Sequence, residues 1–85
     1  MNNFNKEVFE QDVFEVLAML SKVPKEKITL QDSLADNLNL DSLKRMEALS
    51  RIADKYDLDP DLEEVMAIAT VQDVMTSMQK YFENT

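Results

Sequence analysis

Apolar residues recur every three or four positions in three stretches of this chain, which is the spacing that gathers them on one face of an α-helix. The first stretch runs from Asn5 to Leu20, the second from Ser42 to Tyr56, and the third from Val71 to Phe82. The residues on these faces are Phe9, Val13, Val16, Leu17 and Leu20; Leu43, Met46, Leu49, Ile52, Ala53 and Tyr56; and Val71, Val74, Met75, Met78 and Phe82. We therefore expect three amphipathic helices whose apolar faces meet in a core.

The segment between the first two helices has no sustained period. Its apolar residues are scattered among polar ones; they are Ile28, Leu30, Leu34, Leu38 and Leu40. Irregular connections of this length are unusual in a compact domain and are often functional. We expect a long loop without secondary structure, whose apolar side chains dock onto the bundle.

Capping residues predict where the helices begin. Asp41 and Thr70 precede the second and the last helix, and both have side-chain oxygens that can accept hydrogen bonds from first-turn N–H groups. A proline stops the second helix, and Asp61 with Glu64 then resembles a capping box for a short additional helix. The sequence therefore predicts an all-α four-helix bundle with a long first loop and a short third helix, in one domain that spans residues 1–85.

The amino-acid composition argues against several classes of function. The 85 residues include no histidine and no cysteine, so the commonest general base and the thiolate nucleophile are missing, and we expect no enzyme. The formal net charge of −8 disfavours nucleic acid and anionic lipid as partners. The N-terminus does not have the pattern of a secretory signal, and no apolar run reaches membrane-spanning length, so we expect a cytoplasmic protein without stable membrane insertion.

The tripeptide Asp41-Ser42-Leu43 is the main chemical feature. It puts a hydroxyl group at a helix N-terminus, where unpaired N–H groups and the helix dipole favour a phosphate ester. Taken alone, this tripeptide is also ordinary capping chemistry with an unmodified serine.

The order of the elements, together with three landmarks in register, resembles the acyl carrier protein family from about Val8 to Phe82. The landmarks are Leu38-Asn39-Leu40-Asp41-Ser42-Leu43 with Glu47 after it, Tyr56-Asp57, and Thr70-Val71-Gln72. The resemblance implies that a phosphopantetheinyl transferase attaches 4′-phosphopantetheine from coenzyme A to Ser42. It also implies that the thiol of this arm carries acyl groups as thioesters, which explains why the chain needs no catalytic residues of its own.

By the same resemblance, Asp41 holds the helix start and helps the transferase to position Ser42, while Leu43 is a partly exposed contact for partners. Further contacts are expected from Lys44, Arg45, Met46 and Glu47 on the exposed edge of the second helix. The partners implied are the acyl-loading, elongating or acyl-transfer enzymes of fatty acid, lipid or polyketide biosynthesis. We expect the carrier to act as a monomer.

The chain departs from the family pattern at two places. Asn39 stands where the family usually has glycine, and asparagine is the next best residue for left-handed backbone angles. The second helix, usually strongly acidic in fatty-acid carriers, here has four basic residues and two acidic ones; they are Lys44, Arg45, Arg51 and Lys55, against Glu47 and Asp54. This favours a specialised carrier, although Lys44 and Arg45 can also be explained as solvated residues paired with nearby acids.

Several alternatives remain open at this stage. An aminoacyl or peptidyl carrier usually has two glycines around the serine, and a helical adaptor would bind a partner without ever being modified.

We expect the methionines on helical faces to pack in the core, or else to part and admit an acyl chain; these are Met46, Met66, Met75 and Met78. The spacing of Asp57, Asp59 and Asp61 resembles a calcium loop, but the glycine and glutamate that such a loop needs are replaced, so no specific metal site is expected beyond loose divalent-cation binding.

Overall fold

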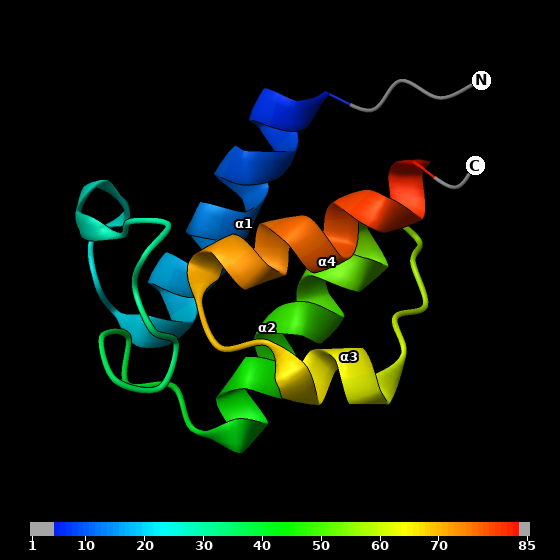
Figure 1. Ribbon diagram of the computed structural model, residues 1–85. Helices are drawn as coiled ribbons and strands as arrows, with labels where there is room; N and C mark the ends of the chain where they lie inside the picture. Colours follow the sequence, from blue (N-terminus) through cyan, green and yellow to red (C-terminus); the bar gives the residue numbers. More distant parts are fainter. Residues whose placement is uncertain (1–4, 84–85) are drawn as a thin grey trace.

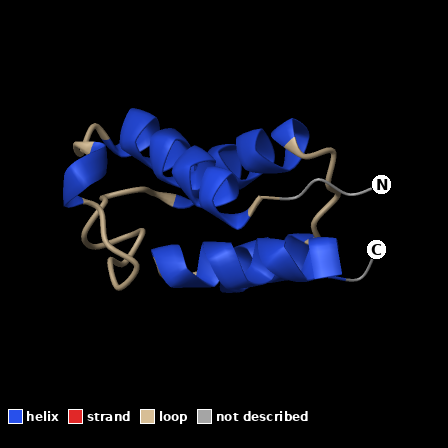
Figure 2. Ribbon diagram, turned by 90° about the horizontal axis from the view of Figure 1, so that it is seen from above, coloured by secondary structure: helices blue, strands red, loops and turns tan. Residues whose placement is uncertain are grey.

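The computed structural model describes residues 5–83 and contains four α-helices (Figure 1). They are α1 (Lys6–Ser21), α2 (Ser42–Lys55), α3 (Leu62–Ala67) and α4 (Val71–Glu83). Viewed from above, α4 lies along one side of the bundle (Figure 2). The all-α architecture, the long first connection and the short third helix are as predicted, and α2 ends one residue early because Tyr56 is its C-cap. No helix among the described residues is long and apolar enough to cross a membrane.

The core draws buried side chains from α1, α2, α4, the long loop and Ile68 at the end of α3, and the partly buried Val65 of α3 packs against it. Its buried members are Phe9, Val13, Leu17, Ile28, Leu34, Leu38, Leu40, Ala48, Leu49, Ile52, Ala53, Ile68, Val71, Val74, Met75 and Met78. Burying one large apolar side chain stabilises a fold by about 1.5–3 kcal/mol. Four of the five loop residues that were expected to dock are buried, and Leu30 is half-buried, so the loop forms one wall of the core.

The loop is more ordered than the sequence suggested. It contains the one-turn 3₁₀ helix η1 (Lys25–Lys27), and an isolated antiparallel β-bridge joins Ser33 to Thr70. The first two N–H groups of α4 donate to loop carbonyls, from Val71 to Asp32 at 3.0 Å and from Gln72 to Leu30 at 2.9 Å. A helix leaves these N–H groups without intrahelical partners, so the loop supplies acceptors to the start of α4.

The predicted N-caps are confirmed. Asp41 accepts from the Lys44 N–H at 2.9 Å, and Asp61 accepts from the Glu63 N–H at 3.2 Å. At the start of α4, the Thr70 hydroxyl accepts from the Asp73 N–H at 3.1 Å. The Asp73 carboxylate accepts from the backbone N–H groups of Ala69 and Thr70 in return, and these bonds hold the pKa of Asp73 below its usual value. Each such cap contributes about 0.5–2 kcal/mol.

The methionine prediction is half wrong. Met75 and Met78 are buried on α4, but Met46 and Met66 are 39% and 61% exposed. Met46 lies beside the buried stripe of α2 rather than on it, and Met66 belongs to a helix of only six residues, which is too short to turn a full apolar face inward. The side chain of Phe82, which was expected on the α4 stripe, lies outside the part of the chain whose side chains are described.

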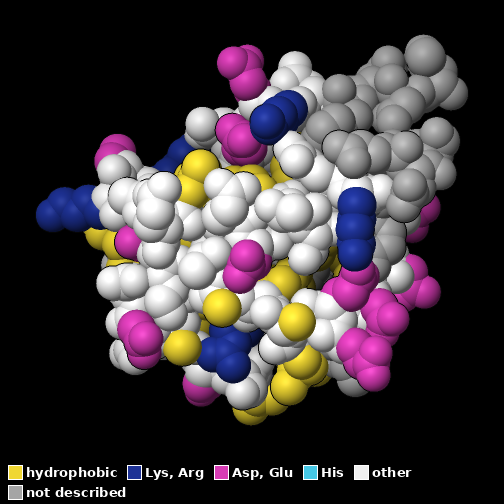
Figure 3. Space-filling model, viewed as in Figure 1, with side chains coloured by type: hydrophobic (Ala, Val, Ile, Leu, Met, Phe, Trp, Pro, Cys, Tyr) yellow, Lys and Arg dark blue, Asp and Glu magenta, His cyan; other side chains and the backbone are white. Residues whose placement is uncertain are grey.

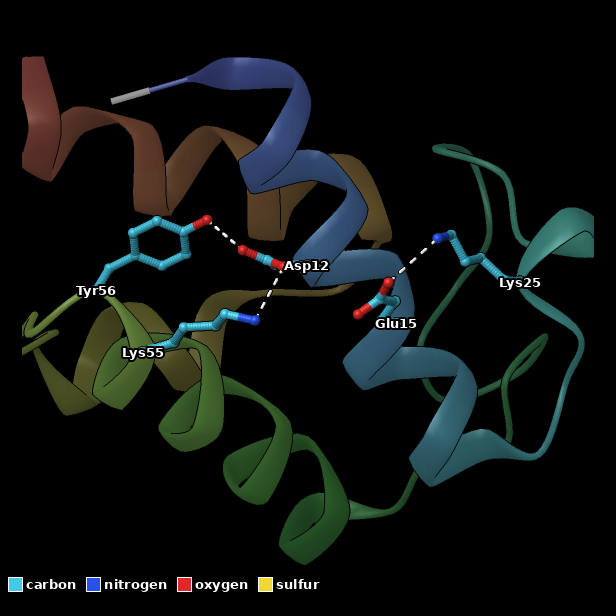
Figure 4. A network of polar contacts seen from close by, with 5 residues as sticks. All are labelled: Asp12, Glu15, Lys25, Lys55 and Tyr56. Atoms are coloured by element: carbon cyan, nitrogen blue, oxygen red, sulfur yellow. Dashed lines mark hydrogen bonds and ion pairs between the residues drawn. The ribbon is translucent and has the colours of Figure 1, made fainter. Parts of the chain in front are cut away.

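A polar network joins α1 to the end of α2 (Figure 4). The Asp12 carboxylate accepts from the Tyr56 hydroxyl and from the Lys55 Nζ atom, the latter at 3.0 Å. Burial acts to raise the pKa of Asp12, but the hydrogen bonds from Tyr56 and Lys55 outweigh it, so this pKa is lowered. Burial and the Asp12 carboxylate both raise the pKa of Tyr56. The network fixes the C-terminal end of α2, whose other end carries Ser42.

Candidate functional site

Buried leucines on both sides of a left-handed residue lead the loop into the start of α2. Leu38 and Leu40 are 1% exposed, whereas Asn39 between them is exposed and has a φ of 57°. This angle is compatible with asparagine, which tolerates left-handed angles best after glycine. The Leu40 N–H donates to the Leu34 carbonyl at 2.8 Å, which attaches the segment to the docked loop. Residues 41–43 therefore follow a segment that is attached to the core, and they face solvent.

Asp41, Ser42 and Leu43 are all exposed at the first turn of α2. Asp41 has extended backbone angles, and its carbonyl oxygen accepts the first helical bond from the Arg45 N–H at 2.9 Å. Ser42 is the first helical residue, so its hydroxyl lies beside the positive end of the helix dipole. Leu43 is 77% exposed, which is more than the partial exposure expected from the sequence. A leucine this exposed next to a solvent-facing hydroxyl is available to a partner.

Arg45 is not simply a solvent-facing cation. It is half-buried, and its Nη1 atom donates to the Leu40 carbonyl oxygen at 2.9 Å. Its Nη2 atom lies 3.4 Å from the Ser42 Oγ atom. The side chain therefore turns back toward the motif, a contact that the sequence pattern did not predict because the acceptor is a backbone carbonyl that any residue could supply.

The charges along α2 are not spread evenly. Lys44 is exposed, and Arg45 is half-buried, so two basic residues follow Ser42 within the first turn of α2. One turn further on, Glu47 accepts from Arg51 at 2.9 Å in an i,i+4 pair. The carboxylate that follows the motif is thereby paired with Arg51, and the Asp41 carboxylate is bonded to the Lys44 backbone N–H.

An apolar cleft opens behind the exposed edge of α2. Met46 is one of its lining residues, and the cleft has a volume of about 240 Å³. Its lining residues are Met46, Leu49, Ser50, Ala53, Asp54, Leu58, Asp59, Pro60 and Val65. Figure 3 shows hydrophobic side chains gathered in this part of the molecule, over the start of α2 and α3. With Leu43 and Met66 also exposed, the site combines a hydroxyl, two cations and apolar contact area.

The residues present fit a phosphate-linked prosthetic group. The Ser42 hydroxyl is accessible, the first turn of α2 favours an anion, and an arginine nitrogen already lies beside the oxygen that would be esterified. All of the predicted site residues from Asp41 to Glu47 lie on this one turn and the next. Within residues 5–83, the structure brings together no group of three or more side chains that could ligate a metal ion.

Comparisons with known proteins agree with this geometry. A family model described as "Phosphopantetheine attachment site" matches residues 11–77. The chain is 34% identical over 74 residues to an acyl carrier protein of an Exiguobacterium species, which covers 87% of this chain and 94% of that protein.

Two mycobacterial proteins are also similar. The meromycolate extension acyl carrier protein of Mycobacterium leprae is 31% identical over 71 residues, which is 84% of this chain and 62% of that relative, so the chain spans less than two thirds of its length. A solved structure of a protein from Mycobacterium tuberculosis, also called an acyl carrier protein, superposes with a TM-score of 0.79 at 26% identity, covering 86% of this chain and 97% of that one.

Proposed function

Because the chain belongs to the phosphopantetheine attachment site family, we propose that Ser42 is the residue to which its 4′-phosphopantetheine is attached. The chain is an acyl carrier rather than an enzyme, as are the acyl carrier proteins that it resembles. When bound, the group supplies a thiol that holds acyl intermediates as thioesters. The assignment to Ser42 rests on one observation above all, the exposed hydroxyl at the start of α2 within the matched region.

Three other serines have less suitable surroundings. The hydroxyls of Ser21 and Ser33 accept local backbone hydrogen bonds, from Val23 at 3.1 Å and from Asp36 at 3.1 Å. Ser50 is exposed but lies in the middle of α2, where the backbone N–H groups are already used within the helix. Ser42 combines exposure with a helix N-terminus, and this combination supports its selection.

Neighbouring residues have separate roles in this proposal. Asp41 caps α2 and so holds the Ser42 hydroxyl in a constant direction for the transferase. Leu43 and Met46 offer apolar contact area to partner enzymes, and Lys44, Arg45 and Glu47 add charged contacts. Arg45 has the smallest free surface of these charged residues because its guanidinium is turned toward Leu40.

Acyl carrier proteins work with a phosphopantetheinyl transferase and with acyl-handling enzymes. The cations at the start of α2 support partners that differ from those of a housekeeping fatty-acid synthase, and the relative from Mycobacterium leprae is itself named for meromycolate extension. We expect a specialised carrier that acts as a monomer. We also expect it to form one domain over residues 1–85 and to be located in the cytoplasm. Equal turnover of its acylated form by standard fatty-acid elongation enzymes would refute the specialised role.

Intact mass spectrometry tests the attachment site. The purified chain is incubated with coenzyme A, magnesium and a promiscuous phosphopantetheinyl transferase, together with Ser42→Ala and Ser50→Ala. We expect a mass increase of one phosphopantetheine in the wild type and in Ser50→Ala, and none in Ser42→Ala. Ser50→Ala is the matched control because it removes an exposed hydroxyl from the same helix.

Two results would overturn the proposal. Modification of Ser42→Ala would place the attachment elsewhere. No increase in a wild type whose circular dichroism shows folded helix, while a known carrier in the same mixture is modified, would contradict the assignment and favour an unmodified helical adaptor.

A further inference from the structure

The position of the Arg45 guanidinium has a consequence for the prosthetic group. One nitrogen is hydrogen-bonded to the Leu40 carbonyl at 2.9 Å, and the other lies 3.4 Å from the Ser42 Oγ atom. The planar guanidinium holds its nitrogens in a rigid fork, so anchoring one of them restricts where the other can point. A half-buried arginine is therefore held beside the hydroxyl oxygen.

The anchor of Arg45 is itself fixed. Leu40 is buried, and its N–H donates to the Leu34 carbonyl at 2.8 Å. Leu34 is also buried, and its own N–H donates to the Ala69 carbonyl at 2.9 Å. A chain of backbone hydrogen bonds thus runs from the α3–α4 connection through the loop to the residue that holds Arg45. The position of the guanidinium is therefore set by backbone hydrogen bonds among buried residues of the core.

Other basic residues on α2 have different partners. Arg51 donates to Glu47 at 2.9 Å, and Lys55 donates to Asp12 at 3.0 Å, so both are directed away from Ser42. Lys44 is exposed, and its ammonium is on a flexible stem. Arg45 is the cation on this helix that the structure places in contact with the Ser42 oxygen.

We propose that Arg45 is a positioning residue that binds the phosphodiester once Ser42 is esterified and holds the root of the arm against the first turn of α2. The inference rests on Ser42 as the attachment site. Esterification puts a phosphodiester on the Oγ atom, which lies 3.4 Å from Nη2, and the two non-bridging oxygens of this diester share one negative charge. A hydrogen bond between a guanidinium and a phosphate oxygen is charge-assisted and stronger than one to a neutral hydroxyl. The Leu40 carbonyl keeps its own nitrogen of the fork, so this contact needs no rearrangement of the loop.

Phosphorus and nitrogen NMR spectra of the modified chain test this contact directly. A phosphopantetheinyl transferase is used to attach phosphopantetheine from coenzyme A to the wild type, Arg45→Met, Arg45→Gln and Arg51→Met, and this loading is confirmed by intact mass. In the wild type we expect loading to shift the side-chain N–H signals of Arg45 and to leave those of Arg51 unchanged. The phosphorus signal of Arg45→Met should shift away from the wild-type position, whereas that of Arg51→Met, which loses a guanidinium from the same helix, should coincide with it.

Arg45→Gln keeps a neutral donor for the Leu40 carbonyl. If Arg45→Met fails to fold, Arg45→Gln therefore tests whether the guanidinium contacts the phosphodiester. A phosphorus shift in Arg45→Gln like that expected for Arg45→Met shows that the guanidinium contact is lost. Coincident phosphorus signals in the wild type and in Arg45→Gln, with an unmoved Arg45 side chain on loading, would overturn the inference and leave Arg45 as a support for Leu40. Absence of the mass increase in the wild type would instead overturn the assignment of Ser42, before Arg45 is tested at all.

Discussion

Replacing Leu34 with alanine tests whether the long loop is a structural part of the core. Leu34 is 0% exposed, and it packs within the same cluster as the buried residues of all three long helices. Truncation removes buried apolar area and leaves a cavity, which together cost about 2–5 kcal/mol for leucine. The backbone bonds of Leu34 to Ala69 and Leu40 do not depend on its side chain, so this loss reports packing alone. A domain has only about 5–15 kcal/mol in total, so the variant should be close to the limit of folding.

Leu43→Ala is the matched control, because it makes the same chemical change at a residue that is 77% exposed. Urea unfolding followed by circular dichroism should give a change within about 0.5 kcal/mol for Leu43→Ala. For Leu34→Ala we expect a melting temperature lower by at least about 8 °C, because each kcal/mol shifts a domain of this size by about 4–8 °C. Similar free energies of unfolding for the two variants would show that the loop covers the bundle without supporting it.

Two further predictions concern the backbone and the charges. Lys22 caps α1 with a φ of 64°, and a left-handed angle costs a non-glycine residue about 1–2 kcal/mol, partly offset by the greater unfolded freedom of glycine. Lys22→Gly should therefore raise the free energy of unfolding by about 0.5–1 kcal/mol in urea titrations, while Asn39→Gly should change it less; a loss of stability in Lys22→Gly would contradict the argument. The Asp12 carboxylate has a folded pKa below its unfolded value, so its stabilising effect is present above the unfolded pKa of 3.8 and is lost as the pH falls through the folded pKa. Between neutral and acidic pH, the free energy of unfolding should fall less in Asp12→Asn than in the wild type. Equal losses of unfolding free energy in the two proteins would rule out this contribution of the Asp12 carboxylate.

The features that the sequence predicted correctly depend on local patterns. Helix positions follow from a spacing of three and four, and the caps at Asp41 and Thr70 follow from side chains that bond within their own first turn. The tolerance of Asn39 for a left-handed angle is equally local, because the angle is a property of one residue.

The features that the sequence did not predict depend on partners that no side-chain pattern identifies. The loop carbonyls that accept from the start of α4 are backbone groups, which every residue carries. The same is true of the Leu40 carbonyl that orients Arg45. The exposure of Met46 and Met66 depends on how α3 lies against α2, since helical spacing shows a face but not how much of it a six-residue neighbour covers.

The charge around Ser42 and the charge of the whole chain act at different distances on an approaching partner. The net charge of −8 attracts basic proteins during diffusion. Salt screens this attraction beyond about 8 Å under physiological conditions, and at contact the partner meets Lys44 and Arg45 instead. If Arg45 is bound to the phosphodiester, its charge is balanced there and Lys44 becomes the main free cation of the docking edge. Attachment of the arm then changes the surface that partners meet, so an enzyme that docks on this edge can distinguish the unmodified chain from the modified one by charge, before it contacts the thiol.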